Sequence, residues 1–279
     1  MMAYSNLRSL IKEGETALID AQEPAIGATY LMMDLFDLSR TDIMLNERKL
    51  SDVERVQFEE GIARLVRHEP LAHITGFQMF YERKFMVDER VLVPRPETEE
   101  LVALALEHIS EADTVVDIGT GSGAIAATVQ LESGCTMYAT DISQAALQVA
   151  RHNIASLAAQ VTCFEGDLLQ PIIDREIKLD ALLSNPPYIG RDEVAEMNLT
   201  ALYDPELALF AEDEGLALYK RMIQCLPEVM NQGSFVAFEI GHRQADALTQ
   251  YIHAHFSHIH VNVHKDINSN DRVLWFKWC

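Results

Sequence analysis

The chain has 279 residues, of which 48% are hydrophobic, and it carries a formal net charge of −21. This length suits one large α/β domain with a smaller appendage, and the hydrophobic content excludes a disordered or fibrous protein. The acidic charge disfavours broad binding to the phosphates of nucleic acids. The cysteines form no CxxC pair, so neither a zinc site nor a disulfide framework is predicted, and no apolar run approaches the ~20 residues of a membrane span. We therefore expect a soluble, cytoplasmic protein.

The N-terminal part of the chain has a helical pattern. Apolar residues recur at helical spacing between Leu7 and about Arg67, which predicts a small helical bundle. Ser51 and Glu54 have the spacing of a capping box and mark a helix start. Aromatic and β-branched residues between Phe77 and Val93 then predict a β-hairpin that links the bundle to the rest of the chain. The chain is thus expected to consist of three parts, with bounds 1–75, 76–93 and 94–279.

A proline-rich segment from Leu92 to Glu100 follows the hairpin. Its prolines enforce an extended backbone, and Pro96 with the acidic residues after it suits the first turn of a helix that continues to about Ile109. Arg95 and Glu97 are either an exposed ion pair or residues close to a functional site. The sequence of this segment leaves both interpretations open.

From Asp113 onward, predicted strands alternate with predicted helices, which is typical of an α/β fold with a mostly parallel, doubly wound sheet. The polar segment from Arg191 to Phe210 interrupts this order and is predicted to be a loop that faces the substrate. Helical spacing resumes from Asp213 to Val229. The predicted strands are Val115–Ile118, Thr136–Thr140, Val161–Glu165, Leu179–Leu183, Gly233–Ile240 and a terminal pair, Ile259–Val263 with Val273–Trp278.

The turn after the first of these strands reads Gly119-Thr120-Gly121-Ser122-Gly123. With Ala124, its spacing also matches the fingerprint of dinucleotide-binding proteins. Asp117 beside the turn disfavours a pyrophosphate and is suited to attract the ammonium and sulfonium charges of S-adenosylmethionine, although it can also cap the strand end. Asp141, about 20 positions beyond the first glycine, is placed either to bind ribose hydroxyls or to cap the next helix.

A second motif, Ser184-Asn185-Pro186-Pro187-Tyr188, follows the buried strand that ends at Leu183. The two prolines fix φ and restrict the residues before them, so Asn185 has little conformational freedom. An asparagine amide, a proline carbonyl and an aromatic face in one rigid turn can bind a planar group that bears an NH2. The motif therefore predicts a site for an amine or amide, with a plain Pro-Pro strand exit above a packed Tyr188 as the alternative.

These motifs resemble those of the PrmC/HemK family of peptide chain release factor N5-glutamine methyltransferases. Further carriers of the resemblance are Glu69-Pro70-Leu71, Phe80-Tyr81, Glu239-Ile240-Gly241 and Asp271-Arg272-Val273. Asn-Pro-Pro-Tyr alone is shared with several methyltransferases that act on amino groups, and the Pro-Arg-Pro-Glu-Thr-Glu segment makes the resemblance more specific. It covers nearly the whole chain. It implies a Rossmann-like class I methyltransferase that uses S-adenosylmethionine to methylate the glutamine in the Gly-Gly-Gln loop of class-I release factors.

The resemblance also implies roles for individual residues. Asn185 Oδ1 and the Pro186 carbonyl would accept the two amide hydrogens of glutamine, with Pro187 and Tyr188 shaping the pocket; Asn185, Pro186 and Tyr188 are the candidate catalytic residues. No metal is expected. The helical domain is expected to dock the release factor, and the enzyme to act as a monomer that binds neither membrane nor nucleic acid. The expected cofactor-binding residues are Asp117, Gly119, Thr120, Gly121, Ser122, Gly123, Asp141, Asp167, Leu168 and Asn185.

The chain departs from the family pattern at three places. Where the family usually has glycines before an Asp-Gly-Leu, this chain has Ala211-Glu212-Asp213-Glu214-Gly215-Leu216. Leu168 replaces a position that is often larger, and Asn268-Ser269-Asn270 lacks a glycine. These departures concern the conformation of the predicted substrate-facing loop and the packing of the adenine of S-adenosylmethionine. They leave the methyl-transfer motif unchanged.

Other functions fit some of these motifs. Adenine N6 methylation of DNA or RNA uses a similar pocket for an exocyclic amine, although the net charge disfavours it. A glutamine methyltransferase for a ribosomal protein would share the pocket and differ in its docking surface. A nucleotide-dependent oxidoreductase would use the same glycine turn, and a non-catalytic binding module would not need Asn185.

Overall fold

The computed structural model describes residues 6–190 and 199–279, and it divides into two compact units. The first unit contains residues 6–77 and 199–203, and the second contains residues 78–190 and 204–279. Part of the predicted substrate-facing loop, residues 191–198, lies outside the described residues. None of the helices within the described ranges is long and apolar enough to cross a membrane.

The first unit is a bundle of short helices, as the apolar periodicity predicts. The capping box at Ser51 is present, because the Ser51 hydroxyl accepts the Glu54 N–H at 3.3 Å and the Glu54 carboxylate accepts the Ser51 N–H at 2.8 Å. Leu7, Leu31 and Phe58 form the centre of the bundle and are at most 1% exposed. The helices are α1 (Leu7–Asp20), α2 (Ile26–Phe36), α3 (Arg40–Leu45), α4 (Asp52–Leu65) and α5 (Leu71–Thr75).

A segment distant in sequence completes this unit. Residues Leu199–Tyr203 form a 3-10 turn, and the Tyr203 hydroxyl donates a hydrogen bond to the Arg67 carbonyl at 2.7 Å. The chain that leaves the Asn-Pro-Pro-Tyr motif is therefore tied to the helical unit before it re-enters the second unit at Asp204.

The second unit is built on a seven-stranded sheet with the order β5-β4-β3-β6-β7-β9-β8. The first five of these strands are mutually parallel, and β9 pairs antiparallel with both β7 and β8. The α/β, mostly parallel architecture predicted from the sequence is thus confirmed. The strands are β3 (Thr114–Ile118), β4 (Thr136–Asp141), β5 (Val161–Glu165), β6 (Leu179–Ser184), β7 (Met230–Glu239), β8 (Val261–Lys265) and β9 (Asp271–Lys277).

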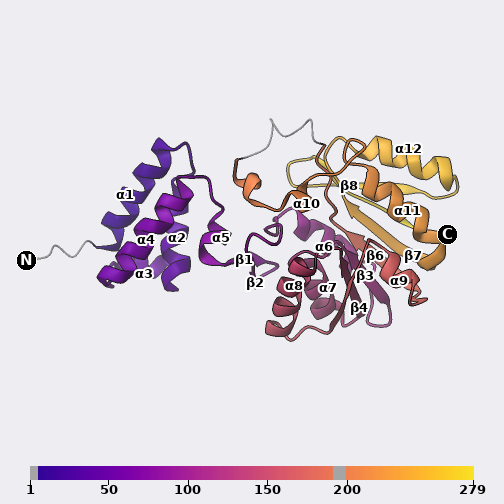
Figure 1. Cartoon of the computed structure of the whole chain (residues 1–279), viewed down its shortest axis with the longest axis horizontal. Coiled ribbons are helices and arrows are strands. Elements are labelled where there is room, and N and C mark those ends of the chain that lie inside the picture. The colour runs from indigo at the N-terminus through magenta and orange to yellow at the C-terminus, as the bar shows by residue number, and fades with distance from the viewer. Residues whose placement is uncertain (1–5, 191–198) are drawn as a thin grey trace, which may run out of the picture. The chain divides into compact units, whose positions relative to one another are not determined.

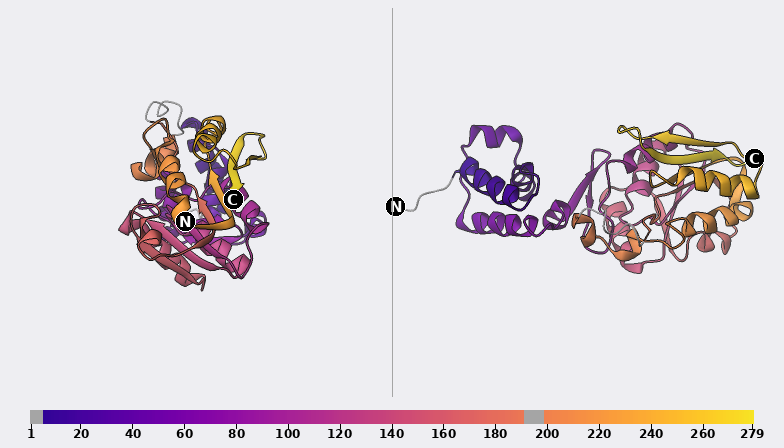
Figure 2. Two further views of the ribbon diagram at one scale, coloured as in Figure 1. Left: turned by 90° about the vertical axis from the view of Figure 1, so that its right-hand side faces the viewer. Right: turned by 90° about the horizontal axis from the view of Figure 1, so that it is seen from above.

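Helices cover both faces of this sheet (Figure 1). Successive residues of a strand point to opposite faces. Val115 accordingly packs in the cluster that contains α6, α7 and α8, whereas Val116 packs against α9, α11 and α12. The antiparallel pair β8–β9, coloured yellow, lies at one edge (Figures 1 and 2). The helices are α6 (Thr98–Leu106), α7 (Ala124–Ser133), α8 (Gln144–Ser156), α9 (Gln170–Ile173), α10 (Glu206–Leu209), α11 (Ala217–Val229) and α12 (Ala245–His255).

Two predicted elements are shorter than the sequence pattern indicated. The hairpin strands are β1 (Phe77–Phe80) and β2 (Arg83–Met86), and the residues from Val87 to Val93 add no strand. Helix α11 begins at Ala217 instead of Asp213, because Asp213, Glu214 and Gly215 all have positive φ and cannot continue a right-handed helix.

The strand order creates a switch point beside β3. The chain runs from β3 outward through β4 to β5 and then returns to place β6 on the other side of β3. Ile118 is in register with Ser184, and the Ser184 hydroxyl donates to the Ile118 carbonyl at 2.7 Å. In doubly wound sheets, ligands bind at the carboxyl ends of the strands at such a point. The glycine turn and Asn185 both begin there.

Asn153 on α8 connects the hairpin to the glycine turn. It is fully buried; its side-chain amide donates to the carbonyls of Met86 and Ser122, both at 2.9 Å, and its Oδ1 accepts the Met86 N–H at 2.8 Å. These bonds join backbone groups at the end of β2 to a backbone carbonyl of the glycine turn.

We predict that Asn153→Leu lowers the free energy of unfolding by about 2–4 kcal/mol, because it leaves three backbone polar groups without their partner. Urea denaturation measures this loss. The matched control is His152→Ala, an exposed position on the same helix, for which we expect a change within about 0.5 kcal/mol. Equal effects of the two substitutions would contradict the role assigned to Asn153.

Candidate active site

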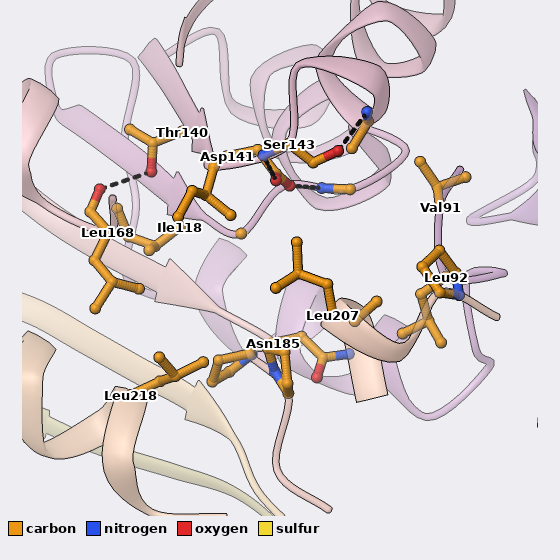
Figure 3. A pocket seen from close by; sticks show the side chains of 18 of the residues that line it. Val91, Leu92, Ile118, Thr140, Asp141, Ser143, Leu168, Asn185, Leu207 and Leu218 are labelled. Carbon is orange, nitrogen blue, oxygen red and sulfur yellow. Dashed lines mark hydrogen bonds between the residues drawn. The ribbon is translucent and has the colours of Figure 1, made fainter. Parts of the chain in front are cut away.

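A cavity of about 310 Å³ opens at the carboxyl ends of β3, β4 and β6 (Figure 3). Asn185 lies on one side of it and Asp141 on the other, while Leu168 and Leu218 lie toward one end and Val91 and Leu92 toward the other (Figure 3). The cavity brings together these residues from the predicted site: Gly119, Gly121, Asp141, Asp167, Leu168, Asn185, Pro186 and Pro187. A smaller adjoining recess is lined by Thr120, Ser122 and again Asn185.

The glycine turn is held open by its backbone conformation. Gly119 and Gly121 have φ of +72° and +54°, values that favour glycine, and no atom lies within 4 Å of where a Cβ would stand on either residue. Their backbone faces the cavity. Gly123 does not line the cavity; it has φ +81° and begins α7, where a Cβ would lie 3.2 Å from Ala150.

Asp141 binds the backbone of the glycine turn and of the residue that caps the next helix. Its Oδ2 accepts the Gly121 N–H at 2.9 Å and its Oδ1 accepts the Ser143 N–H at 2.8 Å, while Ser143 caps α8. Burial raises the pKa of the Asp141 carboxyl. The carboxylate thus orders the glycine turn and the start of the next helix, and it still lines the cavity.

Asp117 does not line the cavity and lies fully buried beneath the turn. Its Oδ2 accepts a hydrogen bond from the Thr120 hydroxyl at 2.6 Å, and its Oδ1 has no hydrogen-bond partner among the described residues. Burial raises the pKa of Asp117 to about 7, the Thr120 bond opposes this rise, and the nearby Asp141 adds to it. A buried carboxyl with an unpartnered oxygen suits a positively charged ligand group and disfavours a pyrophosphate, which weakens the dinucleotide interpretation.

The far end of the cavity carries an ion pair and an apolar slot. Asp167 forms an ion pair with Arg221 on α11, and both side chains are about half exposed. Leu168 has φ +48°, and its carbonyl accepts the Thr140 hydroxyl at 2.9 Å. Leu168 and Leu218 line this end (Figure 3), which gives it a shape and polarity suited to a flat ring.

Asn185 is held by a contact with α6. Its Nδ2 donates to the Thr98 hydroxyl oxygen at 3.1 Å, and no hydrogen bond within residues 6–190 and 199–279 uses its Oδ1. Pro186 and Pro187 line the same cavity, and as prolines they have a restricted backbone and no N–H donor. Residues 185–187, called here the acceptor wall, therefore offer oxygen acceptors and no proline N–H, which suits an NH2 group.

Tyr188 lies behind this wall instead of in the cavity. Its side chain packs with the core cluster of α11 and α12, and burial raises its pKa to about 12. Its carbonyl accepts a hydrogen bond from the Gln244 side chain at 2.9 Å, and the same Nε2 donates to the Glu214 carbonyl at 3.2 Å. Tyr188 thus supports the motif from beneath.

Gly215 packs directly under the Tyr188 carbonyl. Its φ is +81°, and a Cβ at this position would overlap that carbonyl and lie 2.5 Å from Gln244 Nε2. Asp213 and Glu214, at φ of 58° and 53°, adopt left-handed conformations in the first of the departing segments. Ser269, at φ 66°, does the same at the third departure. The local backbone shape is therefore formed by non-glycine residues.

Arg95 pairs with Asp204 and not with Glu97. The guanidinium lies 2.5 Å from Asp204 Oδ2, and the Val93 N–H donates to Asp204 Oδ1 at 3.2 Å. The Asp204 side chain is fully buried. This pair joins the proline-rich segment to the residues before α10, where Pro205 and Leu207 line the cavity. The interpretation of Arg95 as a residue close to the site is the one that the geometry favours.

Several residues of this site had no signal in the sequence analysis. Arg221, Ser143, Leu207 and Leu218 line the cavity from helices and turns whose sequences carry no motif. Glu239 belongs to the family motif Glu239-Ile240-Gly241, and an acidic residue that ends a strand of buried apolar residues is itself a signal of a functional site.

Comparisons with known proteins agree with this geometry. Residues 9–76 match the model of the PrmC N-terminal domain, and residues 98–204 match the methyltransferase small domain. The release factor glutamine methyltransferase of Staphylococcus aureus is 40% identical over 254 residues, which cover 90% of this chain and 91% of that protein. The protein of the same name from Bacillus subtilis is 37% identical over 273 residues, or 95% of each chain. A crystal structure of a methyltransferase from Pyrococcus furiosus shares the fold, with a TM-score of 0.56 and 16% identity over 77% of this chain and 96% of that one.

The doubly wound sheet, the open glycine turn and the matched domain define a Rossmann-like class I methyltransferase. Within that class, identity of 37–40% to curated relatives over at least 90% of this chain shows the particular family. The chain belongs to the release factor glutamine methyltransferases, and the family resemblance seen in the sequence is confirmed.

We predict that Gly215→Ala destabilises the protein more than Gly233→Ala does. Both glycines have φ near +80°, but a Cβ on Gly233 meets nothing within 4 Å. The left-handed backbone alone costs about 1–2 kcal/mol, and the overlap with the Tyr188 carbonyl adds about 1–3 kcal/mol. Urea denaturation of both variants measures the difference, and equal losses would show that the Tyr188 contact is unimportant.

We also predict that affinity for S-adenosylmethionine rises as the pH increases from 6 to 8. Because the pKa of Asp117 is about 7, the carboxylate form becomes dominant over this range, and only that form attracts a cation. Calorimetric titration should give a dissociation constant that falls by up to about tenfold. Asp117→Asn should bind more weakly with little such dependence, whereas the exposed Glu176→Gln should match the wild type. A parallel pH dependence in Asp117→Asn would contradict this assignment.

Proposed function

We propose that this chain transfers a methyl group from S-adenosylmethionine to the side-chain amide nitrogen, N5, of the glutamine in the Gly-Gly-Gln motif of class-I peptide chain release factors. The observation that carries the proposal is the fixed Asn185 amide beside the cavity, whose Nδ2 donates to Thr98 and whose Oδ1 has no hydrogen-bond partner among the residues that the structure describes. Two relatives that match 90% and 95% of this chain carry the corresponding name.

The acceptors at Asn185 and Pro186 suit the methylation of an amide nitrogen, which is a difficult reaction. An amide nitrogen is a poor nucleophile because its lone pair is delocalised into the carbonyl, so it must be oriented and its developing positive charge stabilised. Asn185 Oδ1 and the Pro186 carbonyl can accept its two N–H groups. These hydrogen bonds strengthen as the nitrogen becomes positive, which is stabilisation specific to the transition state. Rigid positioning by the two prolines lowers the entropic part of the barrier.

The cavity residues fit the methyl donor. S-adenosylmethionine supplies an electrophilic methyl group on a positively charged sulfur. Residues 119–123 would lie along its amino-acid end, Asp117 would provide a compensating negative charge beneath it, and Asp141 would bind the ribose hydroxyls. Asp167 and Leu168 would border the adenine at the apolar end of the cavity.

The helical unit, residues 1–75 in the predicted domain division, is proposed to dock the release factor, and residues 94–279 to carry out the transfer. We further propose that the chain acts as a monomer in the cytoplasm, where translation takes place. The net charge of −21 supports recognition of a protein over recognition of nucleic acid.

We predict that the protein adds one methyl group to the Gly-Gly-Gln peptide of a purified class-I release factor, as detected by mass spectrometry after incubation with S-adenosylmethionine. Asn185→Ala should reduce the rate at least ~100-fold, because it removes an acceptor for the developing charge, while cofactor binding is retained.

Asn268→Ala, at an exposed position before β9, is the matched control and should retain full activity. Methylation of DNA, RNA or a ribosomal protein in place of the release factor would overturn the proposed substrate. Full activity of Asn185→Ala would remove this residue from the mechanism.

A further inference from the structure

A buried carboxyl group lies behind Asn185. Glu239 is the last residue of β7 and is 1% exposed. In the parallel pair β6–β7, Ser184 is in register with Phe238, so Asn185 and Glu239 are the next residues on neighbouring strands. The methyl-transfer chemistry described above does not use Glu239, and a buried acid without a role in stability or function is rare.

A chain of polar contacts connects this carboxyl group to Asn185. Asn185 Nδ2 donates to the Thr98 hydroxyl oxygen at 3.1 Å. The side chains of Thr98 and Tyr188 lie close enough to the Glu239 carboxyl group for each hydroxyl to lower its pKa by hydrogen bonding. A threonine hydroxyl has one hydrogen to donate. Asn185 is the donor in its hydrogen bond with Thr98, so that bond does not use the Thr98 hydroxyl hydrogen. This hydrogen is therefore directed to Glu239.

The Thr98 hydrogen bond to Glu239 determines the orientation of the Asn185 amide. If the amide were turned over, its Oδ1 would need the hydrogen of Thr98, and Glu239 would lose a donor. Glu239 Oε2 already has no hydrogen-bond partner among the described residues, so a further loss would leave the buried carboxylate poorly satisfied. The observed arrangement keeps Nδ2 inward and Oδ1 available to the substrate.

We propose, on the basis of the function proposed above, that Thr98 and Glu239 are positioning residues for the methyl transfer: Glu239 orients the Thr98 hydroxyl, which fixes the Asn185 amide with Oδ1 toward the substrate. Neither residue touches the reacting atoms. Both act through the orientation of Asn185.

The groups around Glu239 make the orientation of the Asn185 amide sensitive to pH. Burial raises the pKa of Glu239 to about 7; the Thr98 bond, the positive charge of Arg272 and the Tyr188 bond lower it, and Glu97 raises it. Tyr219, from α11, donates its hydroxyl to the Glu239 main-chain carbonyl at 2.6 Å. The carboxylate form accepts the Thr98 hydrogen, whereas the protonated form can donate to the Thr98 oxygen. Orientation of Asn185 should therefore become firmer as the pH rises through about 7.

The test compares threonine substitutions in the full chain. Thr98→Val removes the hydroxyl at nearly constant shape, Thr98→Ser keeps it, and Thr128→Val is the matched control. Thr128 is a fully buried threonine on α7 whose hydroxyl has no hydrogen-bond partner in the described part of the chain. We expect Thr98→Val to lower kcat for release factor methylation at least tenfold, with the KM for S-adenosylmethionine changed less than twofold. Thr98→Ser should stay within threefold of the wild type, and Thr128→Val should match it.

The pH dependence of kcat distinguishes a role of Glu239 in orienting Asn185 from a role in packing alone. At saturating S-adenosylmethionine, wild-type kcat should rise between pH 6 and 8. Glu239→Gln keeps an acceptor oxygen but cannot ionise, so its kcat should stay level over this range. A Thr98→Val variant as active as Thr128→Val, a Thr98→Ser variant as impaired as Thr98→Val, or a Glu239→Gln variant with the wild-type profile would each overturn the proposal.

A second measurement does not depend on the substrate. The Asn185 side-chain NH2 signals in a ¹H–¹⁵N spectrum, assigned by their loss in Asn185→Ala, should shift with pH around 7 in the wild type but not in Glu239→Gln. Signals that do not respond in the wild type would overturn the positioning proposal. A wild-type enzyme that shows this shift but does not methylate a release factor would instead refute the proposed function.

Discussion

The site depends on the parallel pairing of β3 with β6. Because Ile118 and Ser184 are in register and joined by the Ser184 hydroxyl, the glycine turn and the Asn-Pro-Pro-Tyr motif leave the sheet at the same level. The glycine turn at one strand end and Asn185 at the neighbouring strand end therefore line the same cavity, which is the arrangement that the proposed binding of cofactor and substrate requires. A register shift of one residue would exchange the two faces of β6 and direct its side chains away from this crevice.

Two buried acids lie beneath the two halves of the cavity. Asp117 is below the glycine turn and Glu239 is behind Asn185; each has one oxygen without a hydrogen-bond partner among the described residues, and each has a pKa raised to about 7 by burial. Such groups lower stability when ionised, and they persist where function uses their charge. In the proposed mechanism, Asp117 provides negative charge for the cationic end of the cofactor, and Glu239 orders the Asn185 amide that would contact the substrate.

The sequence predicted the architecture because the alternation of strands and helices and the two rigid turns are local signals. Every strand of the main sheet was predicted within a few residues. The hairpin was predicted too long, and α11 too early, because left-handed residues such as Glu214 have no reliable local signature. The roles of Thr98 and Gln244 could not be predicted, since Thr98 is 87 positions from Asn185 in sequence and meets it only through the packing of α6 on the sheet. The residue roles at the cofactor and substrate remain predictions.

The most direct measurement is a crystal structure of the chain with S-adenosylhomocysteine and a Gly-Gly-Gln peptide. The account predicts that the glutamine amide nitrogen lies about 2.7–3.2 Å from both Asn185 Oδ1 and the Pro186 carbonyl oxygen, while Asn185 Nδ2 stays on the Thr98 hydroxyl. A glutamine bound away from these acceptors, or an Asn185 amide turned so that Nδ2 faces the substrate, would contradict it.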